Sequence, residues 1–155
     1  MFEKTLLSNL VFNEDFTRKT LPFIKPDFFK GRDEVTLFNI ISDFVVKYNN
    51  LPTKEAIQIE LSNNKTLTED EFKNTNTLLN SLQHEEVEQQ WLLDTTEKFC
   101  KDRAVYNAVL QGIQIIDGKD KKHTPEAIPS ILSEALGVSF DRHIGCLLYT
   151  SDAAD

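Results

Sequence analysis

The sequence predicts an all-α protein, a small helical globular domain followed by a long αα-hairpin. Apolar residues recur at spacings of three and four from end to end, which is the period of an amphipathic helix. No stretch shows the sustained alternation of β-branched and polar residues that marks a half-buried strand. The 155 residues are 40% hydrophobic and include 11 Phe, which suits one soluble globular domain. We place the globular part at 1–84 and the hairpin at 85–137.

The globular part is expected to begin with two short helices. Apolar residues at positions 6, 7, 10 and 11 form one stripe of a first helix that ends near Phe12. Asn13 is the expected N-cap of the second helix, because an Asn side chain can accept a backbone N–H of the first turn. Pro22 and Pro26 predict that this second helix frays into a turn around Lys25.

Three further helices complete the globular part. The clearest helical period spans 33–48 and should stop at Asn49-Asn50. Thr53 is the expected N-cap of a short helix that follows. Thr68 and Glu71 stand at the spacing of a capping box, which predicts a helix that starts at position 69 and ends before 83–85.

The hairpin is predicted to consist of a long helix over 86–116, a basic loop and a final helix. At about 1.5 Å per residue the long helix would extend roughly 45 Å. Gly118 ends it, and Lys119–His123 form the loop. Thr124-Pro125 suit the N-cap and first position of the final helix, with Pro129 delaying its start, and Gly137 is a natural residue just past its end.

The charge of the chain points to protein partners. The formal net charge is −8, which repels phosphates, so direct DNA binding by this chain is not expected. Eight acidic residues stand against two basic ones between positions 66 and 98. Two interpretations of this stretch remain open, a solvated helix face with acids at helix starts and an acidic docking patch.

No catalytic, cofactor or metal site is expected. The three histidines, His84, His123 and His143, are far apart, and none has metal-ligand spacing to a cysteine. Cys100 and Cys146 do not suggest a disulfide framework, and no signal peptide or membrane-spanning run of apolar residues is evident. We therefore expect a cytoplasmic protein without membrane contact.

One stripe of the long helix is the remaining functional signal. Its apolar and aromatic residues fall at spacings of three, four and seven, and the stripe is broader than one partner helix would cover. Packing inside the hairpin is one interpretation, and a partner or oligomer interface is the other. The candidate interface residues are Trp91, Leu92, Phe99, Arg103, Tyr106, Leu110 and Ile113, and Val105, Val109 and Ile116 broaden the stripe.

Five segments, in this order, carry a resemblance to a known family. They are M-F-E-K-T-L-L-S-N-L-V-F-N, then P-D-F-F with T-L-F-N-I-I-S-D-F-V-V-K-Y, then L-P-T-K-E-A-I-Q-I-E-L, W-L-L-D-T-T-E-K-F-C-K-D-R-A-V-Y-N-A and A-I-P-S-I-L-S-E-A-L-G-V-S-F-D. Together they resemble the N-terminal domain of a DnaB-type replicative DNA helicase, most like the T-even-phage branch. The resemblance covers residue 1 to about residue 145.

The resemblance implies a role in assembly during DNA replication. In that family the N-terminal domains associate through helical hairpins into a collar on a hexameric ring, which also contacts primase and in some cases a loader. ATP and Mg²⁺ bind a following RecA-like motor domain, whose motifs do not occur in these residues. The resemblance therefore implies a fragment without its own ATPase activity, acting in the cytoplasm of an infected cell if it comes from a phage.

The end of the chain departs from the family pattern. Residues 138–145 are expected to start a linker, whereas 146–155 look like translated sequencing-adapter sequence and are expected to be an unrelated, disordered tail. An alternative from another class is a free-standing helical phage adaptor or regulatory protein. A phosphate-loop motif in frame downstream in the source gene would favour the helicase, and a genuine stop codon would favour the adaptor.

Overall fold

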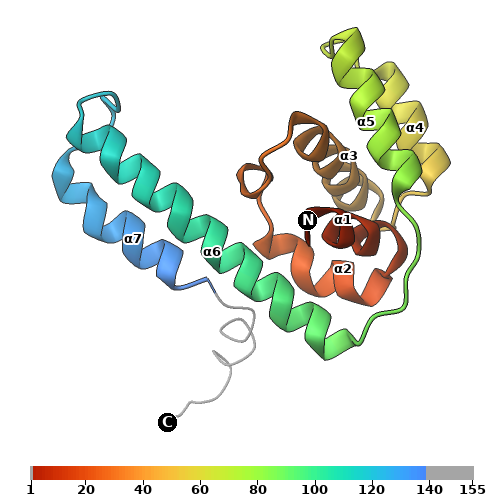
Figure 1. The fold of residues 1–155 in the computed structure, drawn as a ribbon, viewed down its shortest axis with the longest axis horizontal. Coiled ribbons are helices and arrows are strands. Elements are labelled where there is room, and N and C mark those ends of the chain that lie inside the picture. The colour runs from red at the N-terminus through yellow and green to blue at the C-terminus, as the bar shows by residue number, and fades with distance from the viewer. Residues whose placement is uncertain (1, 139–155) are drawn as a thin grey trace. The chain divides into compact units, whose positions relative to one another are not determined.

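The computed structural model describes residues 2–138, and every regular element in that range is helical (Figure 1). The predicted all-α class is confirmed. The chain divides into two compact units, an N-terminal unit that ends at Gln89 and a C-terminal unit that begins at Gln90. The sequence had placed the corresponding boundary at 84/85.

The N-terminal unit opens with α1 (Phe2–Phe12) and α2 (Glu14–Thr20). Asn13 separates the two helices, and its Oδ1 accepts the Phe16 N–H at 3.1 Å, which confirms it as the N-cap of α2. Two 3-10 turns follow, Leu21–Phe23 and Pro26–Phe28, each with a proline in its first turn. The second helix therefore breaks at Leu21, before the lysine at which fraying was expected.

The remaining helices of this unit are α3 (Arg32–Tyr48), α4 (Lys54–Asn63) and α5 (Glu69–Ser81). Asn49 ends α3 in the left-handed conformation with φ 55°, which Asn tolerates better than most residues. Thr53 caps α4, and Thr68 with Glu71 forms the expected capping box of α5. All three helix starts lie within one residue of the predicted positions.

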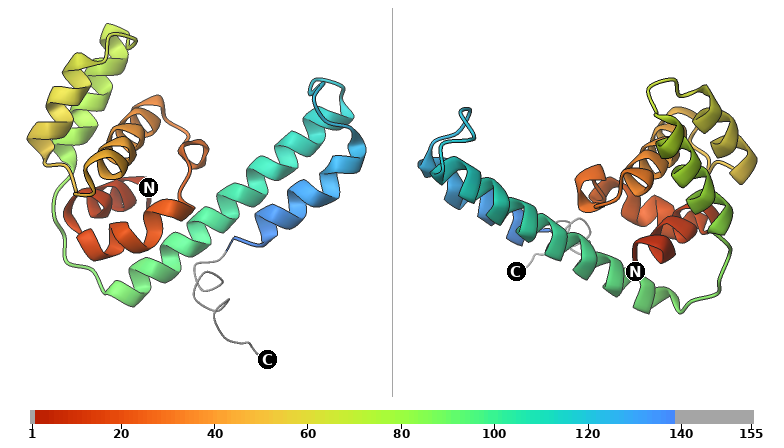
Figure 2. Two further views of the ribbon diagram at one scale, coloured as in Figure 1. Left: turned by 180° about the vertical axis from the view of Figure 1, so that it is seen from behind. Right: turned by 45° about the horizontal axis from the view of Figure 1, so that its top comes forward.

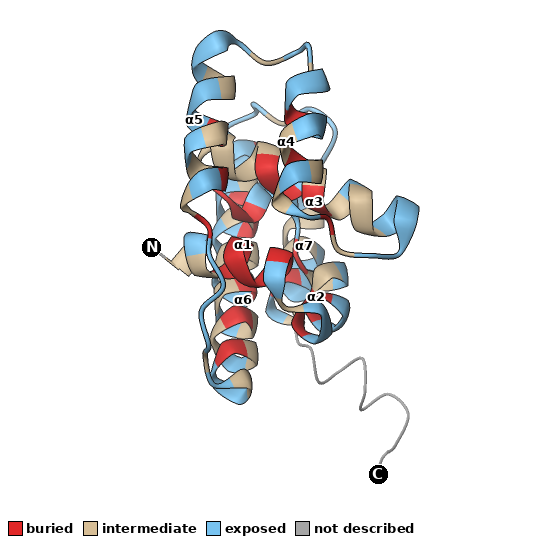
Figure 3. Cartoon of the chain, turned by 90° about the vertical axis from the view of Figure 1, so that its right-hand side faces the viewer, coloured by how far each residue is buried: buried red, intermediate tan, exposed pale blue. Residues whose placement is uncertain are grey.

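The core of the N-terminal unit forms around α1, where buried residues are concentrated (Figure 3). Leu6, Leu7 and Leu10 have no exposed surface, and α3 adds Leu37 and Ile41. Each such side chain contributes roughly 1.5–3 kcal/mol through its removal from water. The spacing of three and four in α1 thus produces a helix whose apolar stripe lies at the centre of its unit.

The C-terminal unit is a helical hairpin of α6 (Gln89–Ile116) and α7 (Ile128–Leu136), which lie side by side in the views of Figures 1 and 2. The long helix begins three residues later than predicted. Gly118, which follows it, has φ 80°, a backbone conformation that suits glycine.

The final helix starts three residues after Pro125, which fits the delay expected from Pro129. Pro125–Ala127 form a 3-10 turn in which the Thr124 side chain makes no capping hydrogen bond, and α7 starts only at Ile128. Pro129 lies in the first turn of α7, where its missing N–H costs no hydrogen bond. Gly137 does follow the helix, but with φ −84° it does not adopt the left-handed conformation.

Within the part of the chain that the structure describes, no helix is both long and apolar enough to cross a membrane. The expected tail at 146–155, and all but the first residue of the expected linker at 138–145, lie outside the described residues.

Candidate functional site

Helix α6 carries two different surfaces along its second half. Ala108, Gly112 and Ile115 are buried, and they recur at spacings of four and three on one side of the helix. At about 100° per residue, Tyr106, Leu110 and Ile113 lie about 130–170° around the helix from that side, and Val109 and Ile116 lie on its flank at about 75–95°. These five apolar residues are exposed and form one set. We call this set the 106–116 face, and its members are Tyr106, Val109, Leu110, Ile113 and Ile116.

The buried side of α6 is the one that packs on α7. A Cβ atom placed on Gly112 would lie 3.6 Å from Cγ2 of Ile128, an ordinary van der Waals distance. The Ile128 side chain of α7 therefore lies against α6 at Gly112. Within the hairpin, α7 packs on this side and not on the 106–116 face.

The 106–116 face is substantially open to solvent. The exposed fractions of its side chains are 52% for Tyr106, 47% for Val109, 41% for Leu110, 49% for Ile113 and 71% for Ile116. A single exposed apolar side chain is ordinary, but five on one face of one helix form a contiguous apolar patch. Such patches mark surfaces that other molecules cover.

The structure separates the seven candidate residues into three groups. Tyr106, Leu110 and Ile113 lie together on the 106–116 face. Phe99 and Arg103 lie one to two turns before it and are half-buried, with the Arg103 guanidinium carbon 5.3 Å from the centre of the Phe99 ring. Trp91 is half exposed near the start of the helix, whereas Leu92 is fully buried within the chain.

Three exposed apolar residues of the hairpin were not among the candidates. Val109 and Ile116 were recognised only as broadening the stripe, yet they are as exposed as the residues chosen. Leu136, at the end of α7, is 63% exposed, although α7 packs in the hairpin. Its position one residue after buried Ala135 turns it by about 100° away from that residue.

Polar side chains before the 106–116 face are engaged with each other. Lys98 donates to Asp102 at 2.8 Å, an i, i+4 pair in which both side chains are largely exposed. Pairs of this kind contribute only about 0.3–0.5 kcal/mol. Any attraction between this surface and a partner would therefore come mainly from its apolar area, with charges setting orientation.

The pKa values of Cys100 and Asp120 in the hairpin are shifted in opposite directions. Burial, and secondarily the nearby Glu97 carboxylate, raises the pKa of the Cys100 thiol to about 12, so the thiol stays protonated and unreactive near neutral pH. At the hairpin tip, Asp120 accepts the Lys122 N–H at 2.8 Å and contacts the His123 ring at 3.1 Å. Those contacts lower the pKa of Asp120, with the backbone hydrogen bond from Lys122 as the largest cause.

Across residues 2–138, no group of three or more His, Cys, Asp or Glu side chains could hold a metal ion. The acidic stretch is partly used for structure. Glu71 caps α5 and its Oε2 lies 2.9 Å from Nε of Arg32, contacts that lower its pKa. Glu85 and Glu86 instead line a shallow hollow with Glu14 and Asp15.

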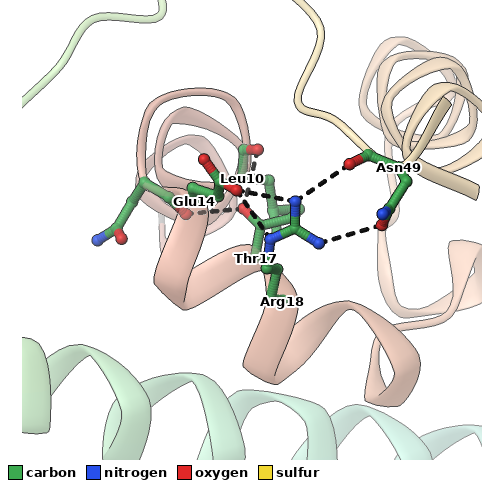
Figure 4. A network of polar contacts seen from close by, with 6 residues as sticks. Leu10, Glu14, Thr17, Arg18 and Asn49 are labelled. Carbon is green, nitrogen blue, oxygen red and sulfur yellow. Dashed lines mark hydrogen bonds and ion pairs between the residues drawn. The ribbon is translucent and has the colours of Figure 1, made fainter.

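The N-terminal unit holds one polar network that sequence reasoning missed (Figure 4). Arg18 on α2 donates through Nε to Glu14 at 2.8 Å and through Nη1 to Asn49 Oδ1 at 3.1 Å. Its Nη2 also donates to the Asn49 backbone oxygen at 3.1 Å, which places a cation at the C-terminal end of α3. Figure 4 shows Arg18 reaching from α2 to this residue. No local pattern links residues 18 and 49.

The chain was compared with protein families and with known proteins. No family model matches the chain. Over 148 residues the chain is 30% identical to a DnaB-like replicative helicase of Enterobacteria phage T4. The chain is similar to a DnaB-like replicative helicase along most of its own length. The match covers 90% of this chain and 31% of the length of that helicase, consistent with an N-terminal domain. The relationship expected from the five segments is therefore confirmed.

Proposed function

We propose that this chain is the N-terminal collar domain of a replicative helicase, which holds copies of the helicase together through the 106–116 face. The observation that supports the proposal is the exposed apolar patch on α6, away from the side that packs on α7. The similarity to a replicative helicase also supports the proposal, because the copies of such a helicase would need a surface through which they associate. In a ring of six copies of the longer protein, the 106–116 face of every copy would lie against a neighbouring copy.

Burial of the 106–116 face would drive this association only weakly. Its five side chains are already about half buried, so each would gain on the order of 1 kcal/mol by complete burial. Association costs an estimated 4–15 kcal/mol in lost translational and rotational freedom. The chain by itself should therefore associate only at high concentration, whereas a ring of the longer protein would add further contacts.

The enzymatic part of the proposal concerns the longer protein. The chain spans about a third of the length of its helicase relative. In our proposal the longer protein is an ATP-dependent helicase whose motor binds ATP and Mg²⁺, and this domain supplies no catalytic or cofactor-binding residue. It would act in the cytoplasm, that of an infected host cell if the protein is a phage one.

Primase is the second proposed partner, with a helicase loader as a further candidate. Trp91 and the Phe99–Arg103 pair lie on α6 before the 106–116 face, and aromatic and Arg side chains are favoured at interface cores. We assign primase contact to this first half of α6. Direct DNA binding is not part of the proposal, because the net charge is −8.

Sedimentation velocity over a wide concentration range tests the assembly role. The doubly substituted Leu110→Ser/Ile113→Ser variant should remain monomeric at concentrations where the parent associates. Val46→Ser is the matched control, because Val46 is 80% exposed on α3 of the N-terminal unit and should not affect association. If the parent stays monomeric at every concentration, or if both variants associate as the parent does, the assignment is wrong.

A primase-binding assay tests the second role separately. Trp91→Ala and Arg103→Ala should weaken binding of the cognate primase while leaving self-association unchanged. If neither substitution changes primase binding, the first half of α6 is not the primase contact.

A further inference from the structure

The segment between α5 and α6, residues 83–88, has no regular secondary structure, and five of its six residues are exposed. It begins after Leu82, which is fully buried, and ends at Gln89, the first residue of α6. Residues 84–87 line a hollow of the N-terminal unit together with residues 12–15. The segment therefore lies beside residues 12–15, which we call the α1–α2 junction.

Electrostatic repulsion opposes this position of the segment. Glu85 and Glu86 line the hollow from the segment, and Glu14 and Asp15 line it from α2. Arg18 offsets part of the charge of Glu14, but the carboxylates around the hollow still repel each other, and the repulsion acts to push the segment away from the α1–α2 junction. Specific contacts must offset it.

The contacts that hold the segment at the α1–α2 junction include a ring pair and a hydrogen bond. The His84 ring meets the Phe12 ring edge to face, with ring centres 6.2 Å apart and planes at 75°. At the end of the segment, Asn13 Nδ2 donates a hydrogen bond to Gln89 Oε1 at 3.2 Å. These residues are 72 and 76 positions apart in sequence, so both contacts depend on the folded unit.

The capping role of Asn13 fixes the direction of its amide. Only the oxygen can accept the Phe16 N–H, so Oδ1 faces α2 and the NH₂ group faces Gln89. The Asn13 side chain thus caps α2 and also donates a hydrogen bond to the first residue of α6. Gln89 Nε2 is buried without a hydrogen-bond partner among the described residues, so its Oε1 carries the contact.

We propose that Asn13 is a latch that holds residues 83–88 as a strap on the N-terminal unit. With the latch closed, this unit extends as one body to Gln89. With the latch open, His84 still contacts Phe12, and the four residues 85–88 become a tether that reaches up to roughly 14 Å. The device thus sets how much freedom the start of α6 has, independently of the 106–116 face.

A nitroxide on the strap tests the latch directly. The label is attached at Glu86→Cys in a Cys146→Ser background, because Cys100 is buried and stays unlabelled. Gln89→Leu removes the acceptor at similar side-chain volume, and Gln89→Glu keeps an acceptor for Asn13 Nδ2. A second label, at Glu60→Cys on α4, reports whether the unit itself is intact.

Loss of one net hydrogen bond should shift the ratio of closed to open strap by roughly two- to tenfold toward the open form. The Gln89→Leu spectrum at position 86 should therefore show narrower, more mobile lines, and position 60 should not change. Gln89→Glu keeps an acceptor but adds a carboxylate near the hollow, so its gain in mobility should be smaller than that of Gln89→Leu. Asn13→Ser keeps a cap for α2 but lacks the amide donor, so it should reproduce Gln89→Leu. The Asn13→Ser/Gln89→Leu double variant should be no more mobile at position 86 than either single variant, because both substitutions remove the same hydrogen bond. Equal spectra for the parent and Gln89→Leu, or equal mobility gains for Leu and Glu at position 89, would overturn the latch.

Discussion

Gly112 offers a quantitative test of which side of α6 packs on α7. In Gly112→Ala the new methyl group would lie 3.6 Å from Ile128 Cγ2, a contact that requires no movement. Alanine is more favourable than glycine in a helix interior by about 0.8–1 kcal/mol. We therefore expect Gly112→Ala to raise the free energy of unfolding of the hairpin by about 1 kcal/mol.

We expect Gly112→Leu to change the free energy of unfolding in the opposite direction. Three further carbon atoms must enter the space held by Ile128, and overpacking of this kind costs about 1–3 kcal/mol. That cost exceeds the gain in helix propensity, so we expect net destabilisation and faster hydrogen exchange of the amides of α7 (Ile128–Leu136). Urea unfolding followed by circular dichroism gives the free energies.

The pair of substitutions is informative because it excludes a simple alternative. If the side of α6 that carries Gly112 faced solvent, Ala and Leu would both stabilise the helix through propensity. A stabilising Gly112→Leu, or a Gly112→Ala that destabilises by 1 kcal/mol or more, would therefore refute the packing described here.

Three further predictions concern other parts of the chain. Arg18→Ala should lower the free energy of unfolding of the N-terminal unit by about 0.5–1 kcal/mol, because it removes the donors to Asn49, and Arg18→Lys should recover only part of the loss in thermal unfolding. The lowered pKa of Glu71 means that its contribution to stability is present above pH 4.5 and is lost as the pH falls through the folded-state value. Glu71→Gln should flatten that acid decline in unfolding free energy measured against pH, and an unchanged slope would contradict the assignment. Cys100, in a Cys146→Ser background, should not react with a thiol reagent at pH 8 until the protein is unfolded, because burial raises its pKa to about 12.

Local signals explain why most helix boundaries could be predicted. Asn13, Thr53 and Thr68 each accept a backbone N–H two or three residues ahead, so their role depends only on neighbouring sequence. The delayed start of α7 also depends on neighbouring residues. Thr124-Pro125 has the right residue types for a helix start, but the backbone closes as a 3-10 turn before Pro129.

Contacts between distant residues could not be predicted in the same way. The apolar period of α6 identified a broad stripe but not which part of it packs on α7, because the packed side is marked by small residues, Ala108 and Gly112, rather than by large ones. Leu92 was predicted to contact a partner but is fully buried, because hydrophobicity alone does not distinguish a buried leucine from an exposed one. The contacts Arg18–Asn49 and Asn13–Gln89 join polar residues with no shared pattern.

Site-specific photo-crosslinking tests most directly whether the 106–116 face joins copies of this chain. A benzophenone side chain is introduced at Ile113, and at Val46 as the control, since both positions are exposed. At concentrations where the chain associates, the probe at position 113 should give a product of dimer mass, with the attachment point mapped to α6 or α7 of the second copy. The probe at position 46 should give little or none. Equal products from the two positions, or attachment to the N-terminal unit alone, would contradict the proposed assembly face.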